Sequence, residues 1–286
     1  MTTISAILED FSVEITGRDV DALHESQTYL PRGIRVNVTF LGNETPSARR
    51  TAAAAVKAAD FTPVPHIAAR RLASREVVEE FVGALHADGT CDHIFVIAGD
   101  PPQPEGSYEG ALSLIETAPL AEYGVQTVSI TGYPEGHPKI ADDVLWVALT
   151  EKVAALTSQN RTGDIITQFA FDADAVISWI EAVRSRGIDL PIRVGVPGPA
   201  GVKRLLSYAR RFGVGSSAGI AKKYGFSLTN LFSTAGPDRF ITDLASRVDP
   251  SVHGTVKLHF YTFGGLRATA EWVQDFAAQT HDTAKA

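Results

Sequence analysis

The stretch HIFVIAGDPP, residues 93–102, begins as an apolar run rich in β-branched residues and breaks off in Gly-Asp-Pro-Pro. Such a run predicts a buried strand over 93–100, ended by its glycine and prolines. Similar segments, rich in Val, Ile, Phe and Thr and ending at Gly, Pro or polar residues, recur along the chain. They are residues 11–16, 35–41, 62–68, 126–133, 164–172, 191–198 and 257–264. The sequence therefore predicts eight strands.

Helical spacing fills the stretches between these segments, and several of them carry start or stop signals. Thr45 and Ser74 stand where a helix N-cap is expected, as does Asp172 before a run that ends at Gly187. Strict alternation of strand and helix with short connections implies parallel strands. Eight such units in 286 residues predict an α/β fold, a closed (β/α)8 barrel.

An open doubly wound sheet is the alternative fold, and it would normally show a glycine-rich fingerprint after its first strand. The turn here reads EITGRDVD and does not fit that fingerprint. Residues 213–246 are more than a single helix needs, so we expect extra helices between strands seven and eight. Because no linker-like stretch interrupts the chain, we predict one domain over residues 1–286.

Composition narrows the class of protein. Hydrophobic residues make up 44% and charged residues 21%, the net charge is −7, and Lys and Arg form no stripe, so a nucleic-acid partner is not expected. No apolar run approaches the length of a membrane span. The single Cys91 cannot form an internal disulfide, and the start MTTISAILEDF does not resemble a signal peptide. We expect a cytoplasmic enzyme, and the sequence does not indicate its oligomeric state.

In a barrel of this type, catalytic groups come from the carboxyl ends of the strands. This rule selects Glu14, Thr39, His66, Asp100, Tyr133, Gln168 and residues 260–265. Glu14 lies between Val and Ile, where desolvation would raise its pKa and suit it to donate a proton. Asp100 lies between a glycine and two prolines, which would fix its carboxylate. The alternative for either acid is a helix N-cap.

Two other patterns point to different chemistry. GSSAG, residues 215–219, matches the G-x-S-x-G of serine hydrolases, with Ser217 as nucleophile and Asp238 and His253 following. The residues before it resemble a helix end, so an ordinary helix start is the alternative. Cys91 and His93 could approach a metal ion, but they begin a strand, at the wrong end of a barrel for catalysis, and no metal site is predicted.

Six motifs together resemble the methylenetetrahydrofolate reductase family over nearly the whole chain: FSVE, PHI, AGDPP, GYPEGHP, ITQFAFD and HFYTF. The resemblance implies a barrel that reduces 5,10-methylenetetrahydrofolate to 5-methyltetrahydrofolate with a reduced nicotinamide nucleotide, usually through bound FAD. By position, Glu14 resembles the acid that opens the folate ring to a 5-iminium cation. Asp100 resembles the aspartate beside the pterin, and Gln168 the glutamine that hydrogen-bonds it.

The resemblance also implies binding residues. For substrate they are Gln168, Phe169 and, in a region that diverges from the family, Tyr224. For the cofactor they are His66, Ala98, Gly99, Tyr108, Tyr133, His137 and Lys152.

The sequence departs from the family at positions where the family binds its flavin. Ala98 stands where the family commonly has arginine, and Leu145, Ala148 and Glu151 replace an aspartate, an asparagine and an arginine, so that only Lys152 remains. The chain thus resembles the flavin-independent, mycobacterial-type members. We expect NADH, or NADPH, to deliver hydride directly, and the substitutions count against FAD. The alternatives are a flavoprotein with the same reaction, the Ser217 hydrolase, and a non-catalytic folate-binding relative.

Overall fold

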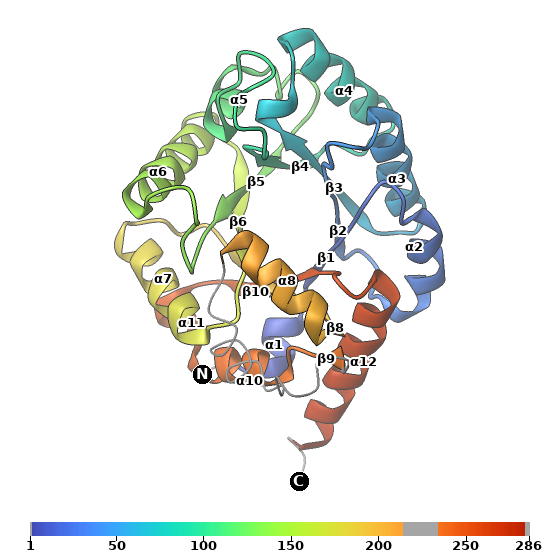
Figure 1. Cartoon of the computed structure of the whole chain (residues 1–286), viewed down its shortest axis with the longest axis vertical. Helices are drawn as coiled ribbons and strands as arrows, with labels where there is room; N and C mark the ends of the chain where they lie inside the picture. The colour runs from blue at the N-terminus through green and yellow to red at the C-terminus, as the bar shows by residue number, and fades with distance from the viewer. Residues whose placement is uncertain (1, 214–233, 284–286) are drawn as a thin grey trace.

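The computed structural model, which describes residues 2–213 and 234–283, confirms the barrel. Eight parallel strands close in the order β1-β10-β7-β6-β5-β4-β3-β2, and helices ring them (Figure 1). The barrel strands are β1 Ser12–Ile15, β2 Arg35–Val38, β3 Thr62–Ala68, β4 His93–Ile97, β5 Thr127–Gly132, β6 Thr162–Phe169, β7 Ile192–Pro197 and β10 Val256–Tyr261. The outer helices are α2 Val20–Ser26, α3 Pro46–Ala58, α4 Arg75–Ala87, α5 Ala111–Thr117, α6 Asp142–Ser158, α7 Ala173–Ser185, α10 Asp238–Arg247 and α12 Leu266–Thr283.

The predicted helix signals act as expected. The side chains of Thr45, Ser74 and Asp172 each accept a hydrogen bond from a backbone N–H in the first turn of α3, α4 and α7. These bonds satisfy amides that have no partner inside the helix. Gly187 takes a φ of +73°, the left-handed conformation that ends α7.

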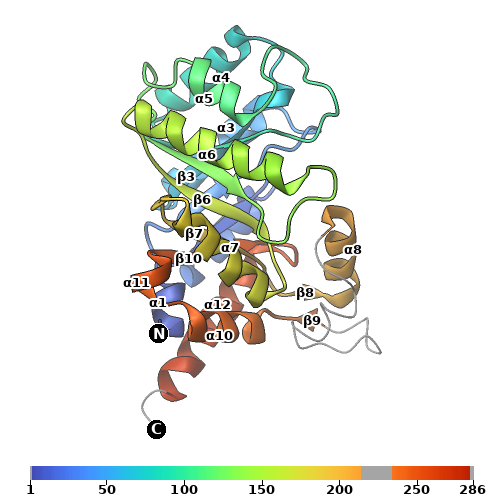
Figure 2. The same cartoon turned by 90° about the vertical axis from the view of Figure 1, so that its left-hand side faces the viewer.

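Additional elements lie between β7 and β10, which confirms the expected insertion. They are α8 Val202–Phe212, the antiparallel pair β8 Ala200–Gly201 and β9 Thr234–Ala235, and the short α11 Pro250–His253. Figure 2 shows α8 and this pair standing out from one end of the barrel, the end where the strands finish. Tyr208 of α8 stacks on Phe263 with ring centroids 3.9 Å apart, which holds the helix there.

Four predicted strand ends are wrong by three residues. β2 stops at Val38 rather than at residue 41, and β4 stops at Ile97 rather than at Asp100. β6 stops at Phe169 rather than at residue 172, and β10 stops at Tyr261 rather than at residue 264. Ala68, the last residue of β3, pairs with Ile97, so the ladder between β3 and β4 ends there. Asp100 therefore lies in the loop after β4. Two 3-10 turns are also present: η1 Gln27–Tyr29 follows α2, and η2 Ala69–Arg71 follows β3.

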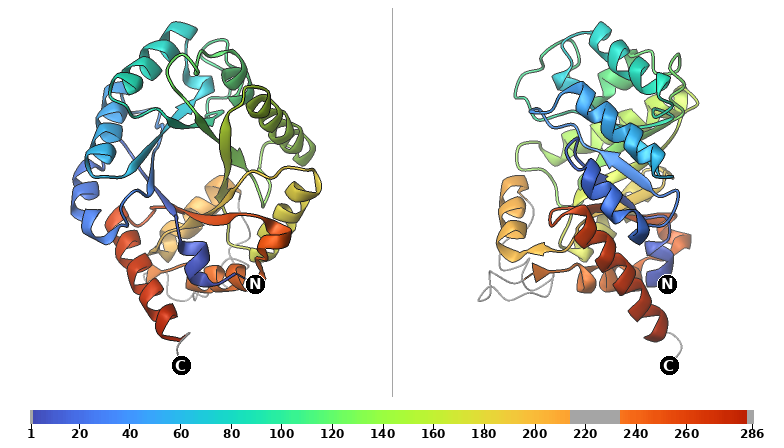
Figure 3. Two further views of the ribbon diagram at one scale, coloured as in Figure 1. Left: turned by 180° about the vertical axis from the view of Figure 1, so that it is seen from behind. Right: turned by 90° about the vertical axis from the view of Figure 1, so that its right-hand side faces the viewer.

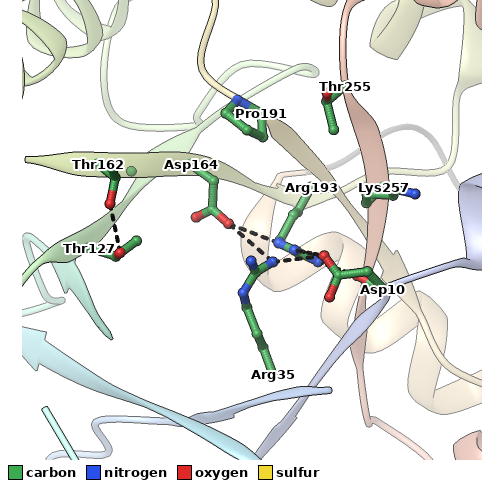
Figure 4. Close-up of a pocket in the computed structure, with 10 residues that line it drawn as sticks. Asp10, Arg35, Thr127, Thr162, Asp164, Pro191, Arg193, Thr255 and Lys257 are labelled. Atoms are coloured by element: carbon green, nitrogen blue, oxygen red, sulfur yellow. Dashed lines mark hydrogen bonds and ion pairs between the residues drawn. The ribbon is translucent and has the colours of Figure 1, made fainter. Parts of the chain in front are cut away.

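Charged side chains close the amino-terminal end of the barrel, and we call this set the charged plug: Asp10, Arg35, Asp164 and Arg193 (Figure 4). Asp164 and Arg193 are buried, whereas Arg35 is half-buried and Asp10 is exposed. The Arg193 guanidinium lies 2.8 Å from the Asp164 carboxylate and 2.7 Å from that of Asp10, and Arg35 lies 3.1 Å from Asp10. A cavity of about 240 Å³ opens beside these groups. The helix α1, Ile4–Leu8, lies at this end of the barrel, as the view from behind shows (Figure 3).

An apolar belt of Val64, Phe95 and Ile166 lies within the barrel, and these three side chains pack on one another separately from the main core between strands and helices. They are at most 5% exposed. The plug closes one end of the barrel, so the chemistry expected of this fold belongs to the opposite, carboxyl-terminal end. Among the helices that the structure describes, none is long and apolar enough to cross a membrane.

Candidate active site

Glu14, near the carboxyl end of β1, is the acid that burial affects most. Its side chain is 15% exposed, and desolvation, with a smaller contribution from the charge of Asp19, raises the pKa of the carboxyl group to about 8. The carboxyl group therefore carries its proton at neutral pH and can donate it. Thr262 ties the strand to the loop after β10 by donating to the backbone oxygen of Glu14 at 2.8 Å.

One buried histidine, His259, lies beside this acid, and a second, His66, lies on β3, two strands away. His259 Nε2 lies 3.7 Å from Glu14 Oε2, and its Nδ1 lies 2.8 Å from the Ser12 hydroxyl. His66 Nε2 donates to Asn37 Oδ1 at 3.2 Å. Burial lowers the pKa of both imidazoles to about 3, so both are neutral at pH 7. The group closest to the Glu14 carboxyl is therefore a neutral imidazole rather than a cation.

The end of β6 presents Gln168 and Phe169. Gln168 is half-buried, and its Oε1 accepts a hydrogen bond from the Phe169 amide at 3.1 Å. Phe169 is 1% exposed and contacts the rings of Tyr261, Phe263 and Phe212 edge-on. Gln168 is thus accessible to a ligand, whereas Phe169 supports the aromatic wall behind it.

Asp100 lies outside the strand, in a turn that requires glycine before it. Gly99 has a φ of +92°, and an added Cβ would lie 3.3 Å from Ala68 Cβ. The Asp100 side chain is 76% exposed, and its Oδ1 accepts from Arg71 Nε at 2.9 Å and Nη2 at 2.6 Å. The sequence analysis missed this arginine, which is 29 residues away.

A pocket of about 500 Å³ extends from the ends of β4 and β5 to α5, α6 and α7. Three residues predicted to bind the cofactor line it, Ala98, Tyr133 and Lys152, together with Leu145 and Ala148, two of the departures from the family. The charged groups in its lining are Asp142 and Lys152. Lys152 is 5% exposed, burial lowers its pKa to about 8, and its ammonium donates to Thr131 Oγ1 at 3.1 Å. The pocket is therefore mainly apolar.

The structure separates other predicted residues from this pocket. His137 contacts the Tyr133 ring, at 5.5 Å between centroids, without lining the cavity. Tyr108 is 4% exposed and packs into the core. Glu151 is exposed on α6. Tyr224 lies outside the described residues.

The hydrolase and metal patterns lie elsewhere. Ser217 is outside the described residues, and His253 lies in α11, before β10 begins, where its Nδ1 accepts from the Asp249 amide at 2.8 Å. Asp238, the third member of that pattern, starts α10. His93 begins β4 and lies 2.8 Å from the Ser129 hydroxyl, and buried Cys91 contacts the Tyr123 carbonyl. The described residues of these two patterns do not gather at the carboxyl ends of the strands.

The residues that the sequence analysis missed are His259, Asn37, Ser12 and Arg71. His259 stands in the HFYTF motif, and Asn37 and Ser12 are polar residues within apolar strand patterns, so a polar residue in a predicted barrel strand is the signal that could have found them. Arg71 follows a strand in a pair of arginines, which by itself indicates an ordinary solvated turn.

The fold and the buried acid define a (β/α)8-barrel protein with a candidate active site at the carboxyl ends of its strands. Comparison with known families agrees, because residues 18–275 match the family model described as methylenetetrahydrofolate reductase. The chain belongs to the methylenetetrahydrofolate reductase family.

Curated relatives are similar over part of the chain. Methylenetetrahydrofolate reductase 2 of Saccharomyces cerevisiae is 31% identical over 130 residues, which are 42% of this chain and 20% of that protein. Methylenetetrahydrofolate reductase (NADH) 1 of Arabidopsis thaliana is 25% identical over 210 residues, 65% of this chain and 33% of that protein. The chain thus spans a third or less of the length of these relatives.

A solved structure shares the fold. It is an uncharacterized protein from Clostridium thermocellum, described as binding two copies of 5-methyl-5,6,7,8-tetrahydrofolic acid, with a TM-score of 0.58, 8% identity and 94% of each chain covered. At this identity the likeness shows the fold alone.

Proposed function

We propose that the chain reduces 5,10-methylenetetrahydrofolate to 5-methyltetrahydrofolate with hydride from a reduced nicotinamide nucleotide. Membership of the family supports the reaction, and the protonated, buried Glu14 at the carboxyl end of β1 is the observation that carries it. Opening the five-membered ring of the substrate requires an acid that still holds its proton at neutral pH, and an exposed glutamate would not.

Each residue then has one task. Glu14 gives its proton to the ring nitrogen that leaves the bridging carbon, which becomes a 5-iminium cation. The Asp100 carboxylate stabilises that cation, and the Gln168 amide binds the pterin. Hydride from the dihydronicotinamide adds to the iminium carbon and makes the methyl group, so one nucleotide is oxidised and one proton is consumed for each folate reduced.

FAD does not fit the pocket that the family resemblance assigns to it. Its diphosphate carries two negative charges, and such groups are normally held by arginine, lysine or backbone N–H donors. The lining offers Lys152, which already donates to Thr131, and it adds the carboxylate of Asp142. Leu145 and Ala148 add only apolar surface. We therefore propose hydride transfer without a flavin.

A nicotinamide nucleotide needs fewer groups to hold its diphosphate than a permanently bound flavin does, because it leaves after each turnover. We propose that the nicotinamide end enters the apolar cavity while the diphosphate stays at its hydrated rim. Among the described residues that line the pocket there is no arginine to bind a 2′-phosphate, which favours NADH over NADPH. The plant relatives named as NADH enzymes support the same preference.

The test is an absorbance spectrum of the purified protein from about 300 to 550 nm, followed by NADH oxidation with methylenetetrahydrofolate and no added flavin. We expect no flavin band and steady turnover. A band near 450 nm, or activity only after FAD is added, would favour the flavoprotein instead. Absence of turnover under both conditions would contradict the proposed reaction, and would leave a non-catalytic folate-binding relative as the better description.

A further inference from the structure

The loop that carries Asp100 is held by Arg70, the residue before Arg71. The Arg70 guanidinium donates to the carbonyl oxygens of Pro101, Pro102 and Glu109 at 3.0, 2.8 and 2.9 Å. Its backbone N–H also donates to Ala98 O at 2.8 Å. These bonds fix the path of the loop from the end of β4 to α5, but none of them reaches the Asp100 side chain.

Arg71 acts on that side chain directly. Its Nε and Nη2 both donate to Oδ1 of Asp100, and in the part of the chain that the structure describes Oδ2 accepts no hydrogen bond. Two charged donors of one planar guanidinium that meet at a single carboxylate oxygen restrain that oxygen, although the pair is not bidentate. The second oxygen is left for a cation.

Two neighbours fix the guanidinium in turn. Glu105 Oε1 lies 3.7 Å from Arg71 Nη1. Gly42, in the loop after β2, lies against the guanidinium so closely that an added Cβ would overlap it. The Arg71 side chain is only 22% exposed, although the carboxylate that it holds is 76% exposed.

From this geometry, and resting on the proposed function, we infer that Arg71 is a positioning residue, which aims Asp100 Oδ2 at the iminium cation and itself touches neither substrate nor nucleotide. The cation exists only after the folate ring has opened. Loss of the orientation should therefore lower kcat and leave the KM of methylenetetrahydrofolate nearly unchanged. Misplacement of a catalytic group by about 1 Å can cost on the order of 100-fold in rate.

Two variants remove the orientation by different routes. Arg71→Ala deletes the guanidinium, and Gly42→Ala keeps both charges but displaces the flexible end of Arg71 sterically. Gly42 does not have a positive φ, so its backbone tolerates alanine. We expect both variants to lower kcat about 10- to 100-fold with KM within about threefold of wild type. Added guanidinium ion at millimolar concentration should restore part of the rate of Arg71→Ala but not that of Gly42→Ala.

The matched control is Arg50→Ala, which removes an arginine that donates through two nitrogens to Asp88, the residue after α4, and that contacts neither Asp100 nor Arg71. It should keep wild-type kcat. In an Asp100→Asn background, Arg71→Ala should change kcat by less than about twofold, because the group through which Arg71 acts is gone.

Three results would overturn the inference. Unchanged kcat in both variants would show that the orientation is not needed. A raised KM with unchanged kcat would show that Arg71 binds a substrate anion directly. A full additional loss in the Asp100→Asn background would show that Arg71 acts independently of Asp100. Wild-type turnover separates these outcomes from failure of the proposed function, since a wild-type protein without turnover overturns both.

Discussion

The surroundings of the Glu14 side chain determine whether its carboxyl group holds a proton at neutral pH. Flanked by Val13 and Ile15 and beside the neutral imidazole of His259, it is easier to keep protonated than to ionise. Its desolvation could be predicted from the strand pattern alone. The contact with His259 could not, because it joins residues 245 positions apart and depends on how the barrel closes.

The raised pKa of Glu14 predicts how kcat falls on the alkaline side of its pH profile. The proposed reaction uses the protonated form, which predominates below the pKa of about 8 and gives way to the carboxylate above it. We expect kcat to be level in the neutral range and to fall about tenfold per pH unit above that pKa. Glu14→Gln should remove the limb and lower kcat by roughly 100- to 10,000-fold while the affinity for folate, measured by fluorescence titration, persists.

Asp19 provides the control for that profile. Its charge raises the pKa of Glu14, so Asp19→Asn should shift the alkaline limb to lower pH without removing it. A limb that stays in place in both variants would mean that another group titrates there.

Among the elements, α6 departs most from an ordinary surface helix. Val144 and Val147 are 53% and 56% exposed, and Leu145 and Ala148 wall the pocket, so apolar side chains occur on several sides. The start and end signals of most helices were readable from the sequence because caps are local. The pocket was not readable, since it forms where α5, α6 and α7 meet the ends of two strands.

The α6 residues that line the pocket allow a test of where the nucleotide binds. Ala148→Phe would fill part of the pocket of about 500 Å³. We expect the KM of NADH to rise about tenfold, which corresponds to about 1.4 kcal/mol of lost binding, with the KM of methylenetetrahydrofolate nearly constant. Thr150→Phe, at an exposed position of the same helix, is the control. Equal effects of the two variants would place the nucleotide elsewhere.

At the scale of the molecule, the strand and helix periods predicted the closed barrel and the insertion before the last strand. They did not predict the charged plug. Arg193 pairs with Asp164 and with Asp10, which lies 183 residues earlier, and such partners are brought together only by barrel closure. The fold follows from local periodicity, whereas the polar interior follows from tertiary contacts.

Arg193→Met tests whether the amino-terminal end of the barrel contributes to stability and not to turnover. Arg193 is 3% exposed, and its loss leaves Asp164, also buried, without its closest cation. We expect the free energy of unfolding to fall by roughly 3–5 kcal/mol in a denaturant titration. The kcat of the folded protein should stay near wild type. Arg35→Met, which removes a more exposed member of the plug, should destabilise less, and a large loss of kcat in either would contradict the separation.

The close approach of Gly42 to Arg71 links two positions that no ladder or helix joins. A side chain at position 42 and a guanidinium in its present place exclude each other. A related barrel that acquires any larger residue at position 42 must therefore change position 71 as well, or hold its aspartate by other means. The two positions can be expected to vary as a pair, with neither substitution tolerated alone at full activity.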